Sequence, residues 1–290
     1  MKIAIFTRTG FHHTSFINRL QEEFEIACVV RESYPEKKKA NPIRSLLKQR
    51  SIGRTKNEIY LNRFFESYSA GFRYHPGVKE YLKAPSDVVI EKIKTKYLNI
   101  NSGEINSTEI EMLLKDVGPD VVVVLGSSII KQNIIMIPKV AMINIHTGLS
   151  PYYRGTWSYG WPIVNKAPEY IGVTLHHINS GIDSGDIIYQ TRPILDIHDD
   201  LNTIFLKVVA EGIELAVKAV KEISKNGSLQ SYKQPVNTGR LYFEKDFSPE
   251  VARRCLSNLE AGLIEKYIQK KDEFDSKVKL PGAIPPRIVK

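Results

Sequence analysis

Asn144 and His146 lie two residues apart at the end of an apolar stretch, and a glycine-flanked turn containing Asp183 follows further along the chain. Side chains alternate faces along a strand, so Asn144 and His146 point to the same side while Ile145 points into the core. An amide donor, an imidazole and a carboxylate can together stabilise a tetrahedral oxyanion and move a proton. The residue types and their spacing therefore indicate acyl transfer as the chemistry to test first.

The elements that must position these residues alternate between strand and helix. Val121–Leu125 has no polar residue, which is typical of a strand buried on both faces of a parallel sheet. The alternation predicts an α/β fold: a Rossmann-like, doubly wound, mostly parallel sheet with helices on both faces. Ligands of such sheets bind beyond the carboxyl ends of the strands, where Asn144 and His146 fall. The predicted strands are Lys2–Thr7, Phe24–Val30, Asp87–Ile90, Val121–Leu125, Ala141–Ile145 and the pair Ile171–Ile178 and Asp186–Thr191, and the predicted helices are His13–Glu23, Ser107–Asp116 and Asn202–Lys225.

Two parts of the chain lack this alternation of strands and helices. Residues 35–85 contain prolines, a basic run and scattered aromatic residues, which predict a helical insertion within a catalytic domain of residues 1–228. Residues 229–290 are predicted to form a small C-terminal appendage. It combines an extended segment within Tyr232–Phe243, a helix over Ser248–Lys270 and a proline-rich end.

The bulk composition indicates the cellular compartment and the kinds of partner to expect. The chain has 290 residues, of which 42% are hydrophobic, and it contains no apolar run of ~18 residues, so no membrane span is expected. Two cysteines and a start that reads as a strand favour a reducing, cytoplasmic setting. The net charge is +9, and eight basic residues but no acidic one fall within Lys37–Lys56. That stretch indicates either an anionic partner, such as a nucleic acid or nucleotide, or a solvated basic loop.

Several well-known site patterns are absent from the sequence. The first predicted strand is followed by Thr7-Arg8-Thr9-Gly10-Phe11, so the dinucleotide-binding pattern G-x-G-x-x-G is missing there, and no P-loop occurs. The cysteine and histidine spacing predicts no zinc or other metal site, and no G-x-S-x-G elbow of a serine hydrolase is present.

The ordered motifs resemble those of one family. The run Asn144–Gly155, followed by Gly172–His176 and Ile182–Asp186, resembles the folate-dependent formyltransferases, which include methionyl-tRNA, glycinamide ribonucleotide and sugar N-formyltransferases. The resemblance covers about residues 118–193 and extends at the level of the fold to 1–34. It is absent over 35–85 and weak after 230. It implies that Asn144, His146 and Asp183 form the catalytic triad, with Asp186 as the rival carboxylate.

The resemblance also implies a donor and two sets of binding residues. The donor would be N10-formyltetrahydrofolate or its N5-formyl isomer, attacked by a neutral acceptor amine while Asn144 and His146 stabilise the oxyanion. His146 or Asp183 would take the proton from the amine. The implied cofactor-binding residues are Leu125, Gly126, Ser127, Ser128, Ile129 and Asp186, and the candidates for binding the acceptor are Arg8, His12, Tyr152, Arg154 and His176.

The acceptor is inferred from a departure within the motif. Gly148-Leu149-Ser150-Pro151 stands where the family commonly has Ser-Leu-Leu-Pro, and this variant resembles the sugar-modifying branch. We therefore expect a nucleotide-linked amino sugar as the acceptor and, from the same branch, a homodimer; nucleic acid is disfavoured. A methionyl-tRNA formyltransferase is the first alternative, although it is expected to carry a C-terminal β-barrel for which the residues after Lys225 leave little room. The second alternative is a non-catalytic nucleotide- or nucleic-acid-binding protein on the same sheet.

Overall fold

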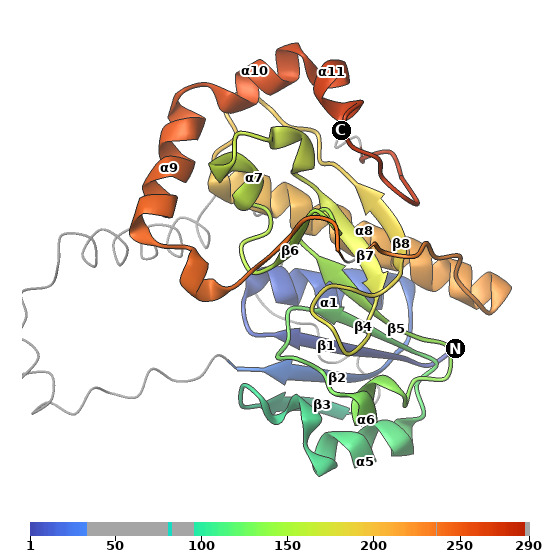
Figure 1. Ribbon diagram of the computed structural model, residues 1–290. Coiled ribbons are helices and arrows are strands. Elements are labelled where there is room, and N and C mark those ends of the chain that lie inside the picture. The colour runs from blue at the N-terminus through green and yellow to red at the C-terminus, as the bar shows by residue number, and fades with distance from the viewer. Residues whose placement is uncertain (34–80, 83–95, 236, 288–290) are drawn as a thin grey trace, which may run out of the picture.

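A twisted central sheet with helices on both faces dominates the molecule (Figure 1). The computed structural model describes residues 1–33, 81–82, 96–235 and 237–287. The strand predicted at Asp87–Ile90, the basic stretch Lys37–Lys56 and the predicted helical insertion, apart from Tyr81 and Leu82, lie outside the described residues. The described residues form a seven-stranded sheet in the order β3-β2-β1-β4-β5-β7-β8. The predicted doubly wound, mostly parallel architecture is confirmed.

The strands of this sheet change direction next to the candidate site. Five neighbouring strands are parallel, and β7 and β8 then run antiparallel to the strand beside them. In the β5–β7 pair, Asn144 lies opposite His176 and His146 lies opposite Thr174. The reversal therefore puts β7 side chains beside the carboxyl end of β5. The strands are β1 (Ile3–Arg8), β2 (Ile26–Glu32), β3 (Lys96–Ile100), β4 (Val121–Leu125), β5 (Ala141–His146), β7 (Val173–His177) and β8 (Ile187–Thr191).

Four helices cover the two faces of the sheet. α1 (Phe11–Glu23) and α8 (Leu201–Asn226) pack on one face, and α5 (Thr108–Val117) and α6 (Gln132–Ile135) pack on the other. Gly212 of α8 faces Ile145, because a Cβ built on Gly212 would lie only 2.4 Å from Ile145 Cγ2. Close packing of α8 on Ile145 fixes the strand between Asn144 and His146, which point to the opposite side.

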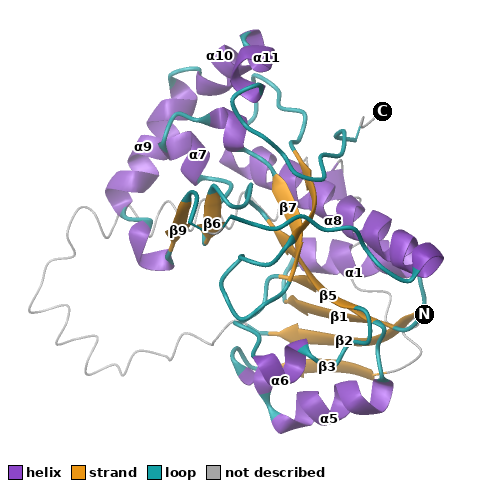
Figure 2. Cartoon of the chain, turned by 45° about the vertical axis from the view of Figure 1, so that its right-hand side comes forward, coloured by secondary structure: helices purple, strands orange, loops and turns teal. Residues whose placement is uncertain are grey.

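The described segment after α8 contributes one short strand, which pairs outside the seven-stranded sheet. β9 (Arg240–Tyr242) pairs in parallel with β6 (Tyr153–Gly155), and Figure 2 shows the two strands side by side near α7 (Trp161–Val164) and α9 (Pro249–Glu260). The single helix predicted over Ser248–Lys270 is wrong. Gly262 adopts the left-handed region, with φ 75°, and divides it into α9 and α10 (Leu263–Gln269), which α11 (Lys271–Asp275) follows. Short 3-10 turns span Glu104–Asn106, Pro168–Tyr170 and Glu244–Asp246.

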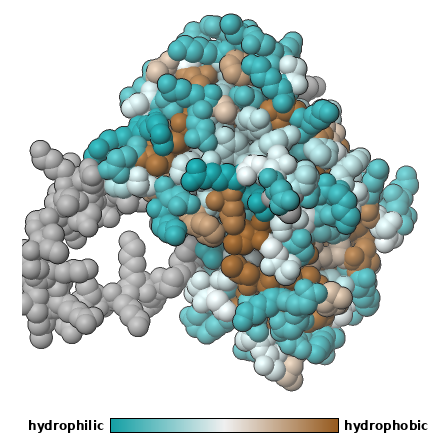
Figure 3. Space-filling view, in the orientation of Figure 1, coloured by the Kyte–Doolittle hydropathy of each residue, from teal (hydrophilic) through white to brown (hydrophobic). Residues whose placement is uncertain are grey.

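Three further observations concern the surface, the helices and the side chains that could bind a metal. Hydrophobic residues gather near the middle of the face shown in Figure 3, with hydrophilic surface above and below them. No helix in the described part of the chain is both long and apolar enough to cross a bilayer. The same part contains no group of three or more His, Cys, Asp or Glu side chains that could hold a metal ion.

Candidate active site

The structure brings Asn144, His146 and Asp183 together at the carboxyl edge of the sheet. Asn144 and His146 end β5, and Asp183 lies in the turn between β7 and β8. Asp183 Oδ2 is 3.3 Å from His146 Nδ1, and Asp183 Oδ1 accepts a hydrogen bond from Asn144 Nδ2 at 3.4 Å. One carboxylate therefore contacts both residues that the strand presents on the same side.

The backbone around Asp183 is shaped to present that carboxylate. Asp183 has a φ of 45°, in the left-handed region that aspartate tolerates better than most residues. A Cβ on Gly185 would lie 1.7 Å from the carbonyl oxygen of His177, so this close approach requires glycine. Gly155 N donates to Asp183 Oδ2 at 2.9 Å. The carboxylate is thus oriented by its own turn and by the β6 backbone.

The His146 ring is held tightly in the protein interior. Only 5% of the side chain is exposed, and Nε2 donates to the carbonyl oxygen of Tyr153 at 2.8 Å. A Cβ on Gly148 would lie 2.8 Å from Nε2 and 2.4 Å from Ser158 Cβ. Glycine at position 148 therefore lets the loop pass directly against the ring.

Protonation of the pair follows from burial and charge. Burial lowers the pKa of His146 and outweighs the Asp183 carboxylate and the Tyr153 carbonyl, which act to raise it. Burial acts to raise the pKa of Asp183, but His146, His176 and the Gly155 N–H hold it below its ordinary value. At neutral pH Asp183 is an anion and His146 is uncharged. With the proton on Nε2 directed at Tyr153, Nδ1 is the basic nitrogen.

His176 contacts the other two polar residues of the group. Its Nδ1 donates to the carbonyl oxygen of His177 at 2.7 Å, which turns Nε2 toward the other polar residues. Nε2 lies 3.1 Å from Asn144 Nδ2 and 3.5 Å from Asp183 Oδ1. The sequence interpretation placed His176 among the acceptor-binding residues. In the structure its Nε2 contacts the Asn144 amide and so helps to determine which way that amide points.

The predicted cofactor loop is fixed at several points. Leu125 ends β4, and the loop that continues to Ile130 is held by side chains from β1, β2 and the turn after β3. The backbone groups of the loop are therefore presented in a fixed arrangement. The hydrogen bonds run from Thr7 Oγ1 to Leu125 O (2.9 Å), from Ser128 N to Glu32 Oε2 (2.5 Å), from Asn106 Nδ2 to Ile129 O (2.8 Å) and from Lys131 N to Asn106 Oδ1 (2.7 Å).

Two residues of the loop suit a flat ring held through backbone groups. Gly126 has a φ of 63°, and a Cβ there would lie 3.1 Å from His13 Cε1, so only glycine fits without displacing that ring. Ile129 is 67% exposed, although it is a large apolar residue. Ser127 lies between them, and its Oγ donates to the carbonyl oxygen of Ser128 at 2.9 Å.

Three of the predicted acceptor-binding residues come from β6, β1 and α1. Arg154 is on β6, and its charge acts to lower the pKa of His146, so it is close enough to influence the ring. Arg8 ends β1 with its Nε 3.9 Å from Glu32 Oε2. His12 is the second residue of α1, where its ring contacts Phe205 edge-on at 5.4 Å, and burial lowers its pKa to about 4.

Asp186 and Tyr152 have their contacts elsewhere. Asp186 Oδ2 lies 2.8 Å from Lys233 Nζ, whereas Asp183 contacts the two histidines. The Tyr152 hydroxyl donates to the carbonyl oxygen of Lys279 at 3.3 Å, and its ring packs against Tyr170. The structure therefore does not gather these two residues with the group around His146.

Sequence reasoning missed the residues that brace the loop after His146. Thr174 Oγ1 donates to Gly148 O at 2.7 Å and accepts from Ser150 N and Gln190 Nε2, both at 2.9 Å. Thr174 and Gln190 are fully buried in β7 and β8. The available signal was a polar residue between two apolar residues in β7, Thr174 between Val173 and Leu175. The backbone contributions of Tyr153 and Gly155 left no signal in residue type.

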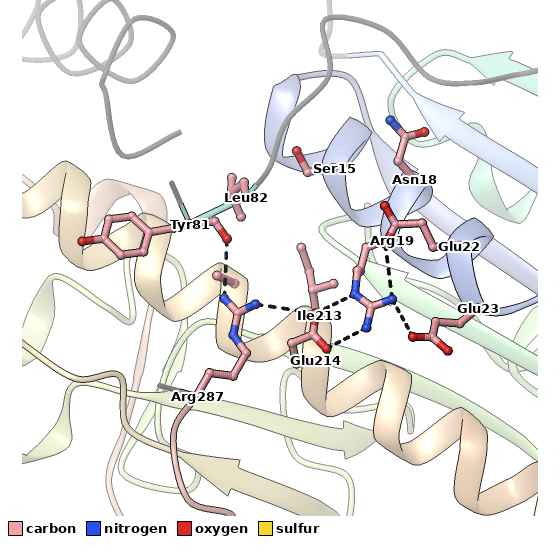
Figure 4. Close-up of a pocket in the computed structure, with 11 residues that line it drawn as sticks. Ser15, Asn18, Arg19, Glu22, Glu23, Tyr81, Leu82, Ile213, Glu214 and Arg287 are labelled. Carbon is pink, nitrogen blue, oxygen red and sulfur yellow. Dashed lines mark hydrogen bonds and ion pairs between the residues drawn. The ribbon is translucent and has the colours of Figure 1, made fainter. Parts of the chain in front are cut away.

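A separate cavity of about 370 Å³ lies between α1, α8 and the C-terminal segment (Figure 4). Its charged groups are paired with one another: Arg19 Nε lies 2.7 Å from Glu214 Oε1, and Arg287 Nη1 lies 3.6 Å from the same oxygen. The described residues that line it include none of the predicted site residues. We therefore place the candidate site at the carboxyl edge of the sheet and not in this cavity.

The fold and the candidate site define the class of protein, and a match to a family model shows the family. The chain is a Rossmann-like α/β protein with an amide, an imidazole and a carboxylate gathered where β5 ends. It belongs to the formyltransferase family, because the family model described as formyl transferase matches residues 74–220.

Curated relatives match part of the chain. The methionyl-tRNA formyltransferase of Caldanaerobacter subterraneus subsp. tengcongensis is 32% identical over 130 residues, which cover 44% of this chain and 41% of that protein. The enzyme of the same name from Clostridioides difficile is 31% identical over 125 residues, covering 42% and 40%. The chain thus matches about two fifths of the length of these relatives.

Solved structures share the fold at lower identity. The N-formyltransferase of Helicobacter canadensis, in complex with folinic acid and dTDP-3-aminofucose, is 17% identical with a TM-score of 0.53, and the match covers 88% of this chain and 79% of that chain. The phosphoribosylglycinamide formyltransferase of Bacillus halodurans is 18% identical with a TM-score of 0.51, covering 79% and 97%. At this level of identity the likeness concerns the fold alone.

Proposed function

We propose that the chain is an N-formyltransferase that moves a formyl group from formyltetrahydrofolate to the amine of a nucleotide-linked amino sugar. The observation that carries the proposal is the meeting of Asn144, His146 and Asp183 in a member of the formyltransferase family. An amide donor, a neutral imidazole and an ionised carboxylate are the groups that a reaction at a carbonyl carbon needs.

The loop after β4 fits the proposed donor. Its hydrogen bonds to Thr7, Glu32 and Asn106 hold the backbone from Leu125 to Ile129 in one arrangement, and Gly126 keeps the surface open to a flat ring. Formyltetrahydrofolate would supply the activated formyl group, held by backbone groups of Leu125–Ile129. The Helicobacter canadensis protein of the same fold was solved with folinic acid, which is consistent with this donor class.

Asn144 is the proposed donor to the oxyanion. The Asn144 amide nitrogen lies 3.1 Å from His176 Nε2 and donates to Asp183 Oδ1 at 3.4 Å, and these contacts set its orientation. The N–H of the longer contact is the one that a bound formyl oxygen would take over. Donors that are oriented in advance stabilise developing charge without having to reorganise during the reaction. One such donor is typically worth about 2.7–4 kcal/mol.

His146 is the proposed base, with Asp183 as its partner. Burial keeps the ring neutral, so Nδ1 can take the proton of the acceptor nitrogen, either directly or by way of the Asp183 carboxylate 3.3 Å away. The resulting imidazolium has an acceptor at each nitrogen, because Tyr153 O faces Nε2 and the Asp183 carboxylate faces Nδ1. The same ring then returns the proton to the departing nitrogen.

The nucleotide-linked amino sugar is the finer part of the proposal. Support comes from the Gly148-Leu149-Ser150-Pro151 variant and from a fold neighbour solved with dTDP-3-aminofucose. The described residues after α8 form helices α9–α11 packed near α7, an arrangement unlike the β-barrel expected of the tRNA branch. Arg154, close to His146, offers a cation for an acceptor phosphate.

Methionyl-tRNA formyltransferase is the second candidate. The curated relatives carry that name, and a net charge of +9 suits a nucleic-acid acceptor. Binding of the chain to tRNA at two salt concentrations separates the two acceptors, because a steep loss of affinity with salt indicates phosphate contacts. Tight tRNA binding together with formylation of methionyl-tRNA would replace the sugar as acceptor.

The test of catalysis uses dTDP-, UDP- and CMP-linked amino sugars and methionyl-tRNA with formyltetrahydrofolate, and measures release of tetrahydrofolate. We expect turnover with one nucleotide sugar and a fall of ~100- to 1,000-fold in kcat for Asn144→Ala, with losses also for His146→Ala and Asp183→Asn. Asn133→Ala on α6, which removes an exposed amide bonded to Glu111, is the control. If all three site variants keep wild-type turnover, the roles proposed for these residues are wrong. If the wild type turns over none of these acceptors, the chain is instead a non-catalytic binding protein.

A further inference from the structure

Glu32 is a buried carboxylate that the proposed reaction does not use. It is the last residue of β2, with no exposed surface, and in the sheet it lies between Arg8 at the end of β1 and Ile100 at the end of β3. It therefore sits at the carboxyl edge, the same edge that carries the candidate site.

Donors from three strand ends converge on this carboxylate. Oε1 accepts from Gly103 N at 2.9 Å, after β3, and Oε2 accepts from Ser128 N at 2.5 Å, after β4. Arg8 Nε, at the end of β1, lies 3.9 Å from Oε2. A buried carboxylate is costly unless it is paired and hydrogen-bonded, and these partners provide the compensation.

We propose that Glu32 is a positioning residue for the formyl donor, an inference that rests on the proposed function. Its carboxylate fixes Ser128 in the middle of the loop Leu125–Ile130, while Asn106 fixes the adjacent Ile129 and Lys131. A loop that is ordered before binding loses less conformational entropy when it takes up its ligand. Arg8 is held beside the same carboxylate.

The competing explanation is that Glu32 only joins the ends of three strands. The two roles differ in what they change. A purely structural bond alters the melting temperature and leaves donor affinity as it was. A positioning role weakens donor binding and leaves kcat at saturating donor and acceptor unaffected, because Asn144, His146 and Asp183 contact one another without Glu32.

The test is the isosteric variant Glu32→Gln in the full chain. The new amide nitrogen cannot accept from a backbone N–H, so one of the two charge-assisted bonds is lost. We expect the Kd for folinic acid, measured by titration calorimetry, to rise about tenfold, equivalent to ~1.4 kcal/mol. The kcat at saturating donor and acceptor should stay within about twofold, since the remote bond acts on donor binding.

Glu104→Gln is the matched control. Glu104 also accepts a backbone N–H, from Asn101 at 2.7 Å, and it directly follows Gly103, but it is exposed and its hydrogen bonds are to Asn101 rather than to the 125–130 loop. The substitution Glu104→Gln should leave the Kd for folinic acid unchanged. A rise equal to that of Glu32→Gln would assign the effect to the turn after β3 and overturn the role of Glu32.

The remaining outcomes separate this inference from the proposed function. If the wild-type chain does not bind folinic acid, the proposed donor is wrong and the role of Glu32 falls with it. If the wild-type chain binds it and Glu32→Gln binds equally well, the role of Glu32 alone is wrong. Should Glu32→Gln not fold, Glu32→Asp decides. It keeps the charge but is one methylene too short to reach both N–H groups, so weaker donor binding supports the role and unchanged binding overturns it.

Discussion

At the scale of single residues, His146 determines how the site responds to pH. A base acts only when uncharged, and burial lowers the pKa of His146 below the ordinary 6.5. We therefore expect kcat/KM to be flat through neutral pH and to fall as the pH drops through a value below 6.5. The measurement is kcat/KM for the preferred acceptor between pH ~4 and ~9, a range that includes the ordinary pKa of an imidazole and the acid side of it.

The variant Asp183→Asn identifies the titrating group in the same experiment. The Asp183 carboxylate acts to raise the pKa of His146, so its removal should move the inflection further toward acid while turnover falls. If turnover falls but the inflection does not move, the loss of kcat/KM at acid pH is not caused by protonation of His146. Stability of the variant is checked by thermal unfolding, because Asp183 also accepts from Gly155 N.

At the scale of elements, the β6–β9 pair connects the C-terminal segment to the candidate site. A Cβ on Gly155 would lie 2.0 Å from the carbonyl oxygen of Tyr242 in β9, and Gly155 N donates to Asp183. Gly155→Ala should therefore separate the two strands and misplace the Asp183 carboxylate. We expect the variant to lose both stability, by more than ~1 kcal/mol, and most of its turnover.

Gly227→Ala separates this effect from backbone strain. Gly227 ends α8 with a φ of 73°, close to the 87° of Gly155, but a Cβ there would meet nothing within 4 Å. Alanine at this position should cost about 1 kcal/mol of stability through its left-handed conformation and leave turnover unchanged. Equal turnover in the two variants would disprove the link from β9 to Asp183. Thermal unfolding and initial rates are the two measurements.

Elements with a strong local pattern were predictable from the sequence, and elements made by distant pairing were not. Val121–Leu125 is uniformly apolar and Asn202–Lys225 has apolar residues at helical spacing, and both predictions are confirmed within a residue or so by β4 and α8. β6 is only three residues long and pairs with β9 far along the chain, so its own sequence, between Pro151 and Gly155, reads as a loop.

The same limit applies to the candidate site. The order of the motifs placed Asn144, His146 and Asp183 together, because side chains with chemistry leave a signal in residue type. The partners that hold them, Tyr153 O and Gly155 N, are backbone atoms and leave none. Glu32 did leave a signal, a single acid at the end of an apolar strand, but its partners come from strand ends that are adjacent only in the folded sheet.

At the scale of the whole molecule, the C-terminal residues close over the edge of the sheet. Tyr232 pairs with Ile187 and Ala283 pairs with Gln190, so two separate segments cover β8, which would otherwise be an exposed edge. We propose that residues 229–290 are an appendage to a catalytic domain of residues 1–228 that folds onto it in this way. Covering an edge strand limits its pairing with other chains.

The end of this appendage makes the stability of the molecule depend on pH through Glu211. Glu211 lies on α8, and burial raises its pKa to about 7, although Arg287 acts to lower it with a charge and a backbone N–H. In the unfolded chain the pKa is near 4.5. Between these values the folded state binds more protons than the unfolded state, so the contribution of Glu211 to stability is full below pH 4.5 and is lost as the pH rises through about 7.

Arg287→Ala should therefore be more damaging at alkaline than at acid pH. At pH ~5 Glu211 is protonated in the folded state and hardly needs the cation, whereas at pH ~8 the variant leaves a buried carboxylate with only its N–H partner. Arg287 also contacts Glu214 and the carbonyl oxygen of Tyr81 (Figure 4), and loss of those contacts should be nearly independent of pH in this range.

The melting temperatures of wild type, Arg287→Ala, Glu211→Gln and the double variant are compared at both pH values. The difference between wild type and Arg287→Ala should grow from pH ~5 to pH ~8, and it should not grow between Glu211→Gln and the double variant, because glutamine does not titrate. If the difference in melting temperature grows equally in these two pairs of proteins, the pH dependence comes from a group other than Glu211.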